Sequence, residues 1–272
     1  MRRLSEILAC ARATGRWIQL LLDYVRLTPL RYPYSFVLRT GEKLTLHEHT
    51  DTIVFWLIFA RRHYPVDPSC RVILDIGANI GMFTLYAARE ARAARIIAVE
   101  PFPDTCRRLK DLTAVNRLED RVTVVNCAVT GKAGNRTMDS ADGIPSQYRR
   151  IHAPETATLN PTHRGPAAAQ PDDNGVPVRS QTLSQVLDQC GVAAADLVKI
   201  NIHGSEYDVL LSTDPKDLLR CRKIALQYHD MPAAIGLGKQ HIFDRLQGLG
   251  FVLLLDDDTR RGSGRAVLAI PS

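Results

Sequence analysis

The sequence predicts an α/β protein built on a mostly parallel, doubly wound sheet of seven strands. Short apolar, β-branched runs alternate with helical segments from residue 71 onward, which is typical of a parallel sheet covered by helices. A loop with two glycines, 75–81, directly follows the first of these runs. The last two runs, 251–256 and 265–270, have only a turn between them, so we expect an antiparallel pair that closes the sheet.

The alternating segments follow one another in a regular order. The expected strands are 71–76, 95–100, 121–129, 197–202 and 223–229, and the expected helices are 82–91, 104–116, 182–189, 206–211 and 239–249. The third of these helices opens on a capping box, because Thr182 is followed three residues later by Gln185. The links are short, so the helices are expected to cross right-handedly and to cover both faces of the sheet.

Residues 1–70 precede the alternating strands and helices. They are expected to form an N-terminal helix and hairpin extension of a main domain at 71–272. Helical spacing of apolar residues and a glycine turn predict its elements. These are an amphipathic helix at 4–27, a hairpin at 35–47 and an apolar helix at 52–64.

The segment 131–178 interrupts the main domain and is rich in Pro, Gly, Ala and Asn. Long irregular insertions in a compact domain are usually functional or disordered. This one follows the third expected strand, so we expect it to hang over the active face as a mobile lid. Its Tyr148 and Arg149 are candidate substrate-binding residues.

Composition narrows the class of protein. The 272 residues are 45% hydrophobic and 24% charged, as in an ordinary soluble globular protein, and the net charge of +6 is too scattered to favour nucleic acid. Six widely spaced cysteines without a CxxC pair speak against zinc or redox motifs and favour a reducing, cytoplasmic location. No metal site is expected, and His47 and His49 are interpreted as a solvated pair.

No apolar stretch is long enough to span a membrane. The amphipathic segment 4–27 is expected to pack on the domain, and peripheral membrane contact is the alternative. The expected partner is a small-molecule or glycan acceptor rather than nucleic acid, and the sequence indicates no particular oligomeric state.

The loop after the first strand is the clearest candidate for a ligand site. Gly77 allows a tight turn and close approach of the backbone to a ligand, and Gly81 allows the next helix to pack close to the sheet. Their spacing is GxxxG, not the GxGxxG that holds the pyrophosphate of a dinucleotide. Open α/β sheets bind ligands at the carboxyl ends of their strands, where this loop lies.

The next two strand ends carry groups that suit a nucleoside. Glu100 ends the second strand, and a carboxylate there can accept hydrogen bonds from both ribose hydroxyls. Phe102 could cover the adenine, and residues 126–128 could meet its edge. The expected cofactor-binding set is Asp75, Gly77, Ala78, Asn79, Gly81, Phe83, Glu100, Pro101, Phe102, Asn126, Cys127, Ala128 and Asn201.

Four segments resemble the FkbM family of methyltransferases. They are VILDIGANIGMFTLYAA (72–88), AVEPFPDT (98–105), VKINIHGSEYDVL (198–210) and LQGLGFVLL (246–254). The first two are shared by many class I methyltransferases, and the third, with its position, points to FkbM. The resemblance covers about residues 35–270. It implies the Rossmann-like class I methyltransferase fold, S-adenosylmethionine as cofactor, and O-methylation of sugars, glycans or polyketide-type natural products.

Methyl transfer to a hydroxyl needs a base near the ends of the fourth and fifth strands. Family members commonly read KIDVEGAE at the fourth strand end, whereas this chain has KINIHGSE at 199–206. Asn201 and His203 thus replace carboxylates. We expect His203 to be the base, because an imidazole titrates near neutral pH. His229 is the second candidate, and Glu206 is expected to start a helix or to accept a hydrogen bond from the substrate.

Three other functions compete with this interpretation. An N- or C-methyltransferase would share the cofactor half, and a catalytically silent cofactor-binding partner would explain the replacement of the carboxylates by Asn201 and His203. A dinucleotide oxidoreductase is disfavoured by the missing GxGxxG and by the terminal strand pair.

Overall fold

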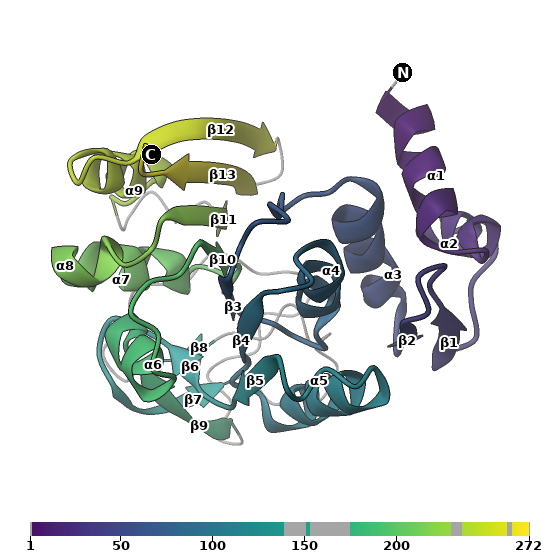
Figure 1. Cartoon of the computed structure of the whole chain (residues 1–272), viewed down its shortest axis with the longest axis horizontal. Coiled ribbons are helices and arrows are strands. Elements are labelled where there is room, and N and C mark those ends of the chain that lie inside the picture. Colours follow the sequence, from purple (N-terminus) through teal and green to yellow (C-terminus); the bar gives the residue numbers. More distant parts are fainter. Residues whose placement is uncertain (1, 139–150, 153–174, 230–235, 260–262, 272) are drawn as a thin grey trace.

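The computed structural model describes residues 2–138, 151–152, 175–229, 236–259 and 263–271 (Figure 1). Its main sheet has seven strands in the order β12-β13-β11-β10-β3-β4-β5. The bounds are β3 Val72–Ile76, β4 Arg95–Val99, β5 Val122–Val125, β10 Leu197–Ile200, β11 Lys223–His229, β12 Val252–Thr259 and β13 Ser263–Ala269. The predicted fold class, an α/β protein with a mostly parallel seven-stranded sheet, is confirmed.

Pairing within the sheet follows the predicted pattern. Strands β10, β3, β4 and β5 are parallel neighbours, and β11 pairs parallel with β10. Strand β13 lies between β11 and β12 and is antiparallel to both. The terminal hairpin therefore closes the sheet by inserting its second strand next to β11.

Helices cover both faces of the sheet because successive strand side chains point to opposite sides. Figure 1 shows α6 (Leu183–Gln189), α7 (Ser205–Ser212) and α9 (Lys239–Gln247) on one side, and α4 (Met82–Glu90) and α5 (Pro103–Val115) on the other. Each layer encloses its own hydrophobic cluster. A short helix, α8 (Pro215–Leu218), was not predicted.

The N-terminal extension packs into the cluster that lies on the α4 and α5 side of the sheet. It consists of α1 (Arg2–Ala13), α2 (Trp17–Tyr24), the hairpin β1 (Tyr34–Val37) and β2 (Lys43–Leu46), α3 (His49–Phe55) and a π-helix at Trp56–Ala60. The predicted hairpin is confirmed. The single helix expected at 4–27 is wrong, because the chain breaks between α1 and α2 and Thr14 pairs there with Leu38 of the hairpin.

The segment 131–178 was expected to be irregular, and this is wrong for its two ends. Strand β7 (Gly134–Met138) and strand β9 (Val176–Gln181) pair antiparallel and form a second sheet with β6 (Ala128–Val129) and β8 (Ile151–His152). The expected third strand, 121–129, splits into β5 and β6, which belong to different sheets. Tyr148, Arg149 and most of the segment expected to form a lid lie outside the residues that the structure describes, so the lid stays a prediction.

Among the described residues, no helix is long and apolar enough to cross a membrane. All six cysteines are buried free thiols.

Candidate active site

Four loops emerge together at the carboxyl edge of the parallel sheet. The register places Ile76 at the end of β3 opposite Val99 of β4 and Ile200 of β10, and it places Val99 opposite Val125 of β5. The loops that follow therefore leave the sheet at one level. This edge brings the predicted glycine loop, Glu100, Asn126 and Asn201 together.

The glycine loop is shaped by contacts within the protein. A Cβ atom on Gly77, whose φ is +75°, would lie 2.1 Å from the backbone oxygen of Asn201. The side chain of any other residue is thus excluded by the loop after β10, not by a ligand as we expected. The amides of Gly77 and Ala78 both donate to the carbonyl of Val99, at 3.0 and 2.9 Å.

Gly81 serves the packing of a helix other than the one predicted. It precedes α4 with φ +91°, and a Cβ there would lie 2.6 Å from the side chains of Leu109 and Leu112 in α5. Its missing side chain therefore lets α5 pack against the start of α4.

Asp75 anchors the loop from below. Its side chain is fully buried and receives hydrogen bonds from Lys199 Nζ at 2.9 Å and from Thr84 Oγ1 at 2.7 Å. Lys199 also donates to the carbonyl of Gly77 at 2.7 Å. The buried pair joins β3 to β10, so the Asp75 side chain supports the glycine loop, and its expected place in the cofactor-binding set stays a prediction.

Phe83 also belongs to the core rather than to a ligand surface. Its ring is 1% exposed and packs edge-on against Tyr64, with the centroids 5.6 Å apart. Its expected contact with the cofactor is therefore not supported by the geometry.

Glu100 occupies the predicted place at the end of β4. One carboxylate oxygen accepts the backbone N–H of Asn79 at 2.9 Å and the other accepts that of Phe102 at 3.0 Å. A carboxylate has about four lone-pair directions, so two further hydrogen bonds can be accepted. Burial raises the pKa of Glu100 from 4.5 to about 7, and the two backbone donors oppose this shift.

The groups expected around an adenine are only partly available. Phe102 is 3% exposed and packs with Ala128, Met138 and Val178, so it supports the second sheet instead of presenting its ring. Cys127 and Ala128 are likewise buried.

Asn126 is exposed, and its amide nitrogen donates to the carbonyls of Glu100 and Pro101, at 2.9 Å each. The tie fixes the loop after β4 to the end of β5. Among these strand-end residues, Asn126 and the partly exposed Pro101 are thus the ones open to a ligand.

Asn201 brings an unsatisfied acceptor to this edge. Its Oδ1 atom is buried, and the described part of the chain offers it no hydrogen-bond donor. Such a group costs about 1–3 kcal/mol unless a donor reaches it. Together with the spare lone pairs of Glu100, it makes the edge fit a ligand that carries both hydroxyl and N–H donors, as a nucleoside with an amino acid moiety does.

A buried carboxylate holds a histidine beside these loops. Glu206 is 0% exposed, and one of its oxygens accepts both the backbone N–H and the Nδ1 atom of His229, each at 2.8 Å. Its other oxygen accepts the N–H of Gly204 at 2.7 Å. Because an ionised carboxylate only accepts, Nδ1 carries the proton and Nε2 of the neutral ring is left as an acceptor.

His203 lies against this histidine. Ile200 pairs with Leu226, and both histidines come three residues later on their chains, which places them at the same level. Their ring centroids are 4.7 Å apart at an interplanar angle of 43°. His203 has φ +52° and precedes Gly204, the first residue before α7.

Two expectations change with this geometry. Glu206 was a candidate for direct substrate contact, but its fully buried side chain has both oxygens engaged, so it positions His229 instead. His203 was the preferred base, and the buried carboxylate that holds the ring of His229 makes His229 the better supported candidate.

The segment that contains these residues matches the sequence model of a known protein family. A sequence model described as the methyltransferase FkbM domain matches residues 75–253, from the buried Asp75 to the start of the terminal hairpin. The chain belongs to the FkbM methyltransferase family. It is therefore a methyltransferase, and the family assigned by resemblance is confirmed.

Several curated proteins are similar in sequence to this FkbM methyltransferase. It is 30% identical over 69% of its length, and over 75% of the relative, to the 31-O-demethyl-FK506 methyltransferase FkbM of Streptomyces tacrolimicus. It is 28% identical to the methyltransferase sdnD of Sordaria araneosa, over 59% and 67% of the two chains. It is 27% identical over 75% of its length to the AMB antimetabolite synthetase AmbE of Pseudomonas aeruginosa, but this match spans only 11% of that protein.

A crystal structure of a methyltransferase FkbM from Methylobacillus flagellatus superposes with a TM-score of 0.48 and 13% identity. The superposition covers 98% of this FkbM methyltransferase and 58% of the other chain.

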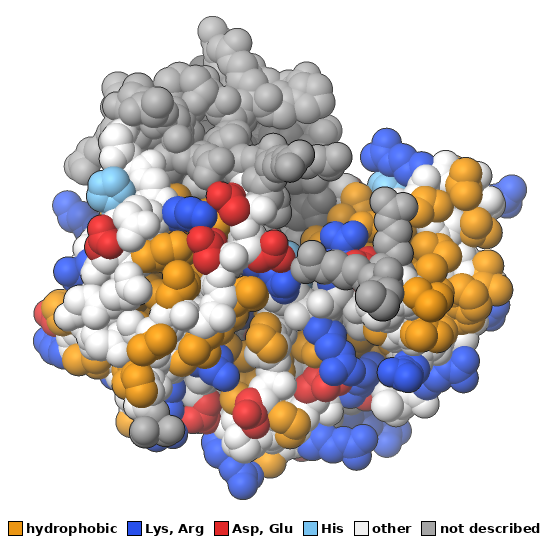
Figure 2. Space-filling view, turned by 90° about the horizontal axis from the view of Figure 1, so that it is seen from above, with side chains coloured by type: hydrophobic (Ala, Val, Ile, Leu, Met, Phe, Trp, Pro, Cys, Tyr) orange, Lys and Arg blue, Asp and Glu red, His pale blue; other side chains and the backbone are white. Residues whose placement is uncertain are grey.

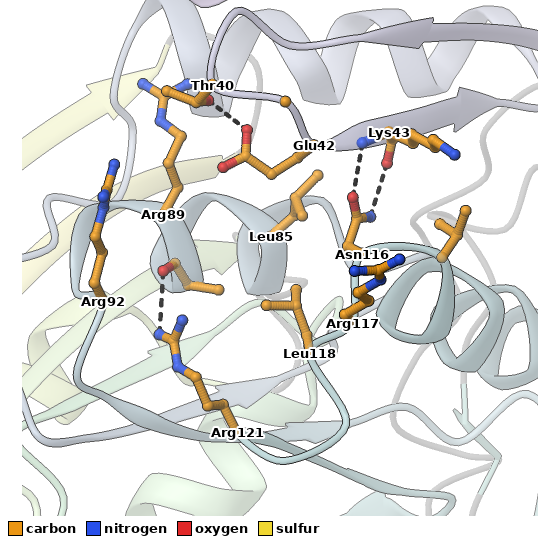
Figure 3. A pocket seen from close by; sticks show the side chains of 13 residues that line it. Thr40, Glu42, Lys43, Leu85, Arg89, Arg92, Asn116, Arg117, Leu118 and Arg121 are labelled. Atoms are coloured by element: carbon orange, nitrogen blue, oxygen red, sulfur yellow. Dashed lines mark hydrogen bonds between the residues drawn. The ribbon is translucent and has the colours of Figure 1, made fainter.

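A cavity of about 510 Å³ shares no lining residue with the strand-end site of this FkbM methyltransferase, and Figure 3 shows the side chains that line it. It is lined by the hairpin turn at 40–43, by one side of α4 with Arg92, by residues 115–118 and by Arg121. Arg121 points into it and donates to the carbonyls of Ala88 and Ala91, at 3.1 and 2.9 Å, so this cation satisfies the end of α4. The cavity therefore forms at the amino edge of the sheet, opposite the loops that hold Glu100 and His229.

Two residues of the FkbM methyltransferase site were missed by sequence reasoning. Lys199 is buried beneath the glycine loop, and its presence in the otherwise apolar strand LVKI was an available signal. Tyr64 lies beside it, with Lys199 Nζ 5.8 Å from its ring centroid and its hydroxyl 3.3 Å from Gln227. Nothing in the sequence around Tyr64 distinguishes it from other apolar residues of the N-terminal extension.

Proposed function

We propose that the chain is an S-adenosylmethionine-dependent O-methyltransferase acting on a hydroxyl of a sugar, glycan or polyketide-type natural product. The observation that carries the proposal is the contact of Glu206 with His229 at the carboxyl edge of β10 and β11, next to the glycine loop. The name of the Streptomyces tacrolimicus relative, which describes a methyl transfer to an oxygen of FK506, supports the choice of acceptor class.

The cofactor would be held by the loops at the ends of β3, β4 and β10. Glu100 would accept ribose hydroxyls through its spare lone pairs, and Asn201 Oδ1 would accept an N–H of the methionine moiety. When bound, S-adenosylmethionine supplies a methyl group on a sulfonium, which is already a good leaving group. The protein therefore needs to position the acceptor and to manage its proton.

His229 is the residue best arranged to take that proton. The acceptor hydroxyl must lose its proton as the new C–O bond forms, and Nε2 is the acceptor atom of the neutral His229 ring. The buried carboxylate of Glu206 holds the ring by Nδ1 and stabilises the imidazolium that results. This arrangement follows the same logic as a histidine oriented by a carboxylate in hydrolases.

His203 remains the second candidate because its ring lies 4.7 Å from that of His229. The contact of His229 with the buried carboxylate of Glu206 is what favours His229 as the base. We therefore place the base at His229 and expect His203 to contact the acceptor or to steady the neighbouring ring.

The proposal is tested by giving the purified chain methyl-labelled S-adenosylmethionine and pools of sugars, glycan fragments and hydroxylated polyketides. We expect label in a methyl ether, located by mass spectrometry of the fragmented product. Label on nitrogen or carbon would replace the proposal by an N- or C-methyltransferase. Binding of S-adenosylhomocysteine without transfer to any of these pools would favour a silent cofactor-binding partner.

A further inference from the structure

The net charge of the chain is concentrated at its N-terminal segment. Residues 1–40 contain seven arginines and two acidic residues, and so carry +5 of the net +6. Both acids are engaged inside the protein. Glu6 accepts from Trp56 Nε1 at 2.9 Å and Arg61 Nε at 3.0 Å, and Asp23 is 1% exposed and bonded to His49 at 3.1 Å.

Large aliphatic side chains are exposed on the same segment. They are Leu4 at 64%, Leu8 at 48%, Ile18 at 50%, Val25 at 48% and Leu27 at 73%. The opposite sides of α1 and α2 are already packed, because Cys10 and Leu20 are fully buried in the core. These helices are therefore apolar both toward the protein and toward the outside.

The N-terminal segment exposes arginines as well as these aliphatic side chains. On α1, Leu4, Leu8 and Arg12 follow one another at intervals of four residues and share the outer side of the helix. Arg16 and Arg31 are exposed nearby in the chain. Figure 2 shows hydrophobic side chains gathered over the N-terminal end of the molecule, with Lys and Arg around them.

We propose that this surface, which we call the N-terminal surface and define by Leu4, Leu8, Ile18, Leu27, Arg12 and Arg31, binds the headgroup region of an anionic lipid bilayer. Aliphatic side chains with arginines around them are the pattern of helices that lie in a membrane interface. Each arginine near a negatively charged leaflet adds attraction, and the aliphatic side chains leave water.

Other occupants fit the surface less well. Two copies of the chain meeting through this surface would set arginines against arginines, and no exposed acid of residues 4–38 is available to neutralise them. A nucleic acid would satisfy the arginines but would leave Leu4 and Leu27 in water.

Flotation of the full chain with vesicles tests the proposal. We expect binding to vesicles of mixed phosphatidylcholine and phosphatidylglycerol, little binding to pure phosphatidylcholine, and weakening as salt rises. Replacing Arg12 and Arg31 by Gln should reduce the partition coefficient about 30-fold, from about 1 kcal/mol for each arginine. Replacing Leu4, Leu8 and Leu27 by Ser should reduce it about 100-fold or more.

Matched variants provide the control. Arg92→Gln with Arg117→Gln removes the same charge elsewhere, and Leu219→Ser with Leu254→Ser removes aliphatic side chains that are 47% and 59% exposed. Both should bind vesicles like the parent chain, and circular dichroism should show every variant folded. Equal losses in control and test variants, or no vesicle binding, would overturn the proposal. Concentration-dependent dimerisation abolished by Leu4→Ser, without vesicle binding, would assign the surface to a second copy.

Discussion

At the residue scale, two carboxylates lie buried at the carboxyl edge of the sheet. Glu206 and Glu100 are 0% and 7% exposed, and each accepts hydrogen bonds from residues of the loops that it supports. A buried carboxylate is costly unless it is bonded in this way. Glu100 and Glu206 therefore hold their loops in place, in addition to any contact that they make with a ligand or a proton.

Glu206 should act through His229 rather than on the substrate. Glu206→Gln keeps the size but can no longer stabilise an imidazolium, so we expect kcat to fall about 10–1,000-fold with little change in KM for the acceptor. A merely structural role would instead lower the melting temperature and raise KM. Glu206→Asp, which restores the charge, should recover part of kcat, and failure of this rescue would contradict the positioning role.

Glu100 should make cofactor affinity depend on pH. Its pKa in the folded protein is raised to about 7, so the carboxylate ionises as pH rises through that value. An ionised acceptor binds ribose hydroxyls more strongly, so affinity for S-adenosylhomocysteine should rise between about pH 6 and 8. In Glu100→Gln the affinity should be flat with pH and weaker by ~1.5–3 kcal/mol above neutrality, measured by calorimetry.

Glu100 should also make the free energy of unfolding of the ligand-free protein depend on pH. Between the ordinary value of 4.5 and about 7 the folded state binds more protons at Glu100 than the unfolded state does. The free energy of unfolding should therefore fall as pH rises through this window. Urea unfolding should show a shallower fall for Glu100→Gln, and identical slopes would mean that Glu100 is not buried as described.

At the scale of elements, the site is a consequence of how closely β3 and β10 approach. The loop after β3 touches the loop after β10 at Gly77, and Lys199 of β10 reaches back to Asp75 of β3. These contacts hold the glycine loop and the loop that leads to His203 in one register.

Gly77 should be the least replaceable glycine of this edge. In Gly77→Ala the new Cβ would meet the Asn201 backbone oxygen at 2.1 Å, with φ at +75°, so we expect destabilisation by at least ~3 kcal/mol. Gly15→Ala is the matched control, because nothing lies within 4 Å of its Cβ position, and it should leave the unfolding midpoint unchanged. Equal stability of the two variants in denaturant would refute the close approach.

Lys199 should stabilise the fold through Asp75. Lys199→Met leaves a buried carboxylate without its cation and should cost ~3–5 kcal/mol in the free energy of unfolding. Replacing both partners, as Asp75→Asn with Lys199→Met, should cost clearly less, because no charge is then stranded. A double variant that is as unstable as the sum of the single variants would show that the pair is not coupled.

At the scale of the whole molecule, the main sheet was predictable because its strands are short apolar, β-branched runs in the sequence. Strand β11 has the predicted bounds, and the terminal hairpin was expected from two apolar runs without a helix between them. Strands β7 and β9 were missed because GNRTM and VPVRSQ are short and polar and form a small sheet apart from the main one. Their pairing depends on partners distant in sequence, which local patterns do not reveal.

The site was predictable in its outline and not in its contacts. Parallel strands end at one edge, so the grouping of the glycine loop, Glu100 and the histidines followed from strand order alone. The Glu206 side chain contacts a histidine 23 residues further along the chain, because α7 lies beside the end of β11. The sequence favoured His203 as the base, and this contact is the reason for proposing His229 instead.

The kcat of His229→Ala, measured beside that of His203→Ala on the identified acceptor, tests the central claim most directly. General-base help is worth about 10²–10⁴ in rate. We expect His229→Ala to lose kcat on that scale while its affinity for S-adenosylhomocysteine stays within about twofold of the parent enzyme, and we expect a smaller loss for His203→Ala. Parental kcat in His229→Ala, with the loss found in His203→Ala instead, would contradict the account.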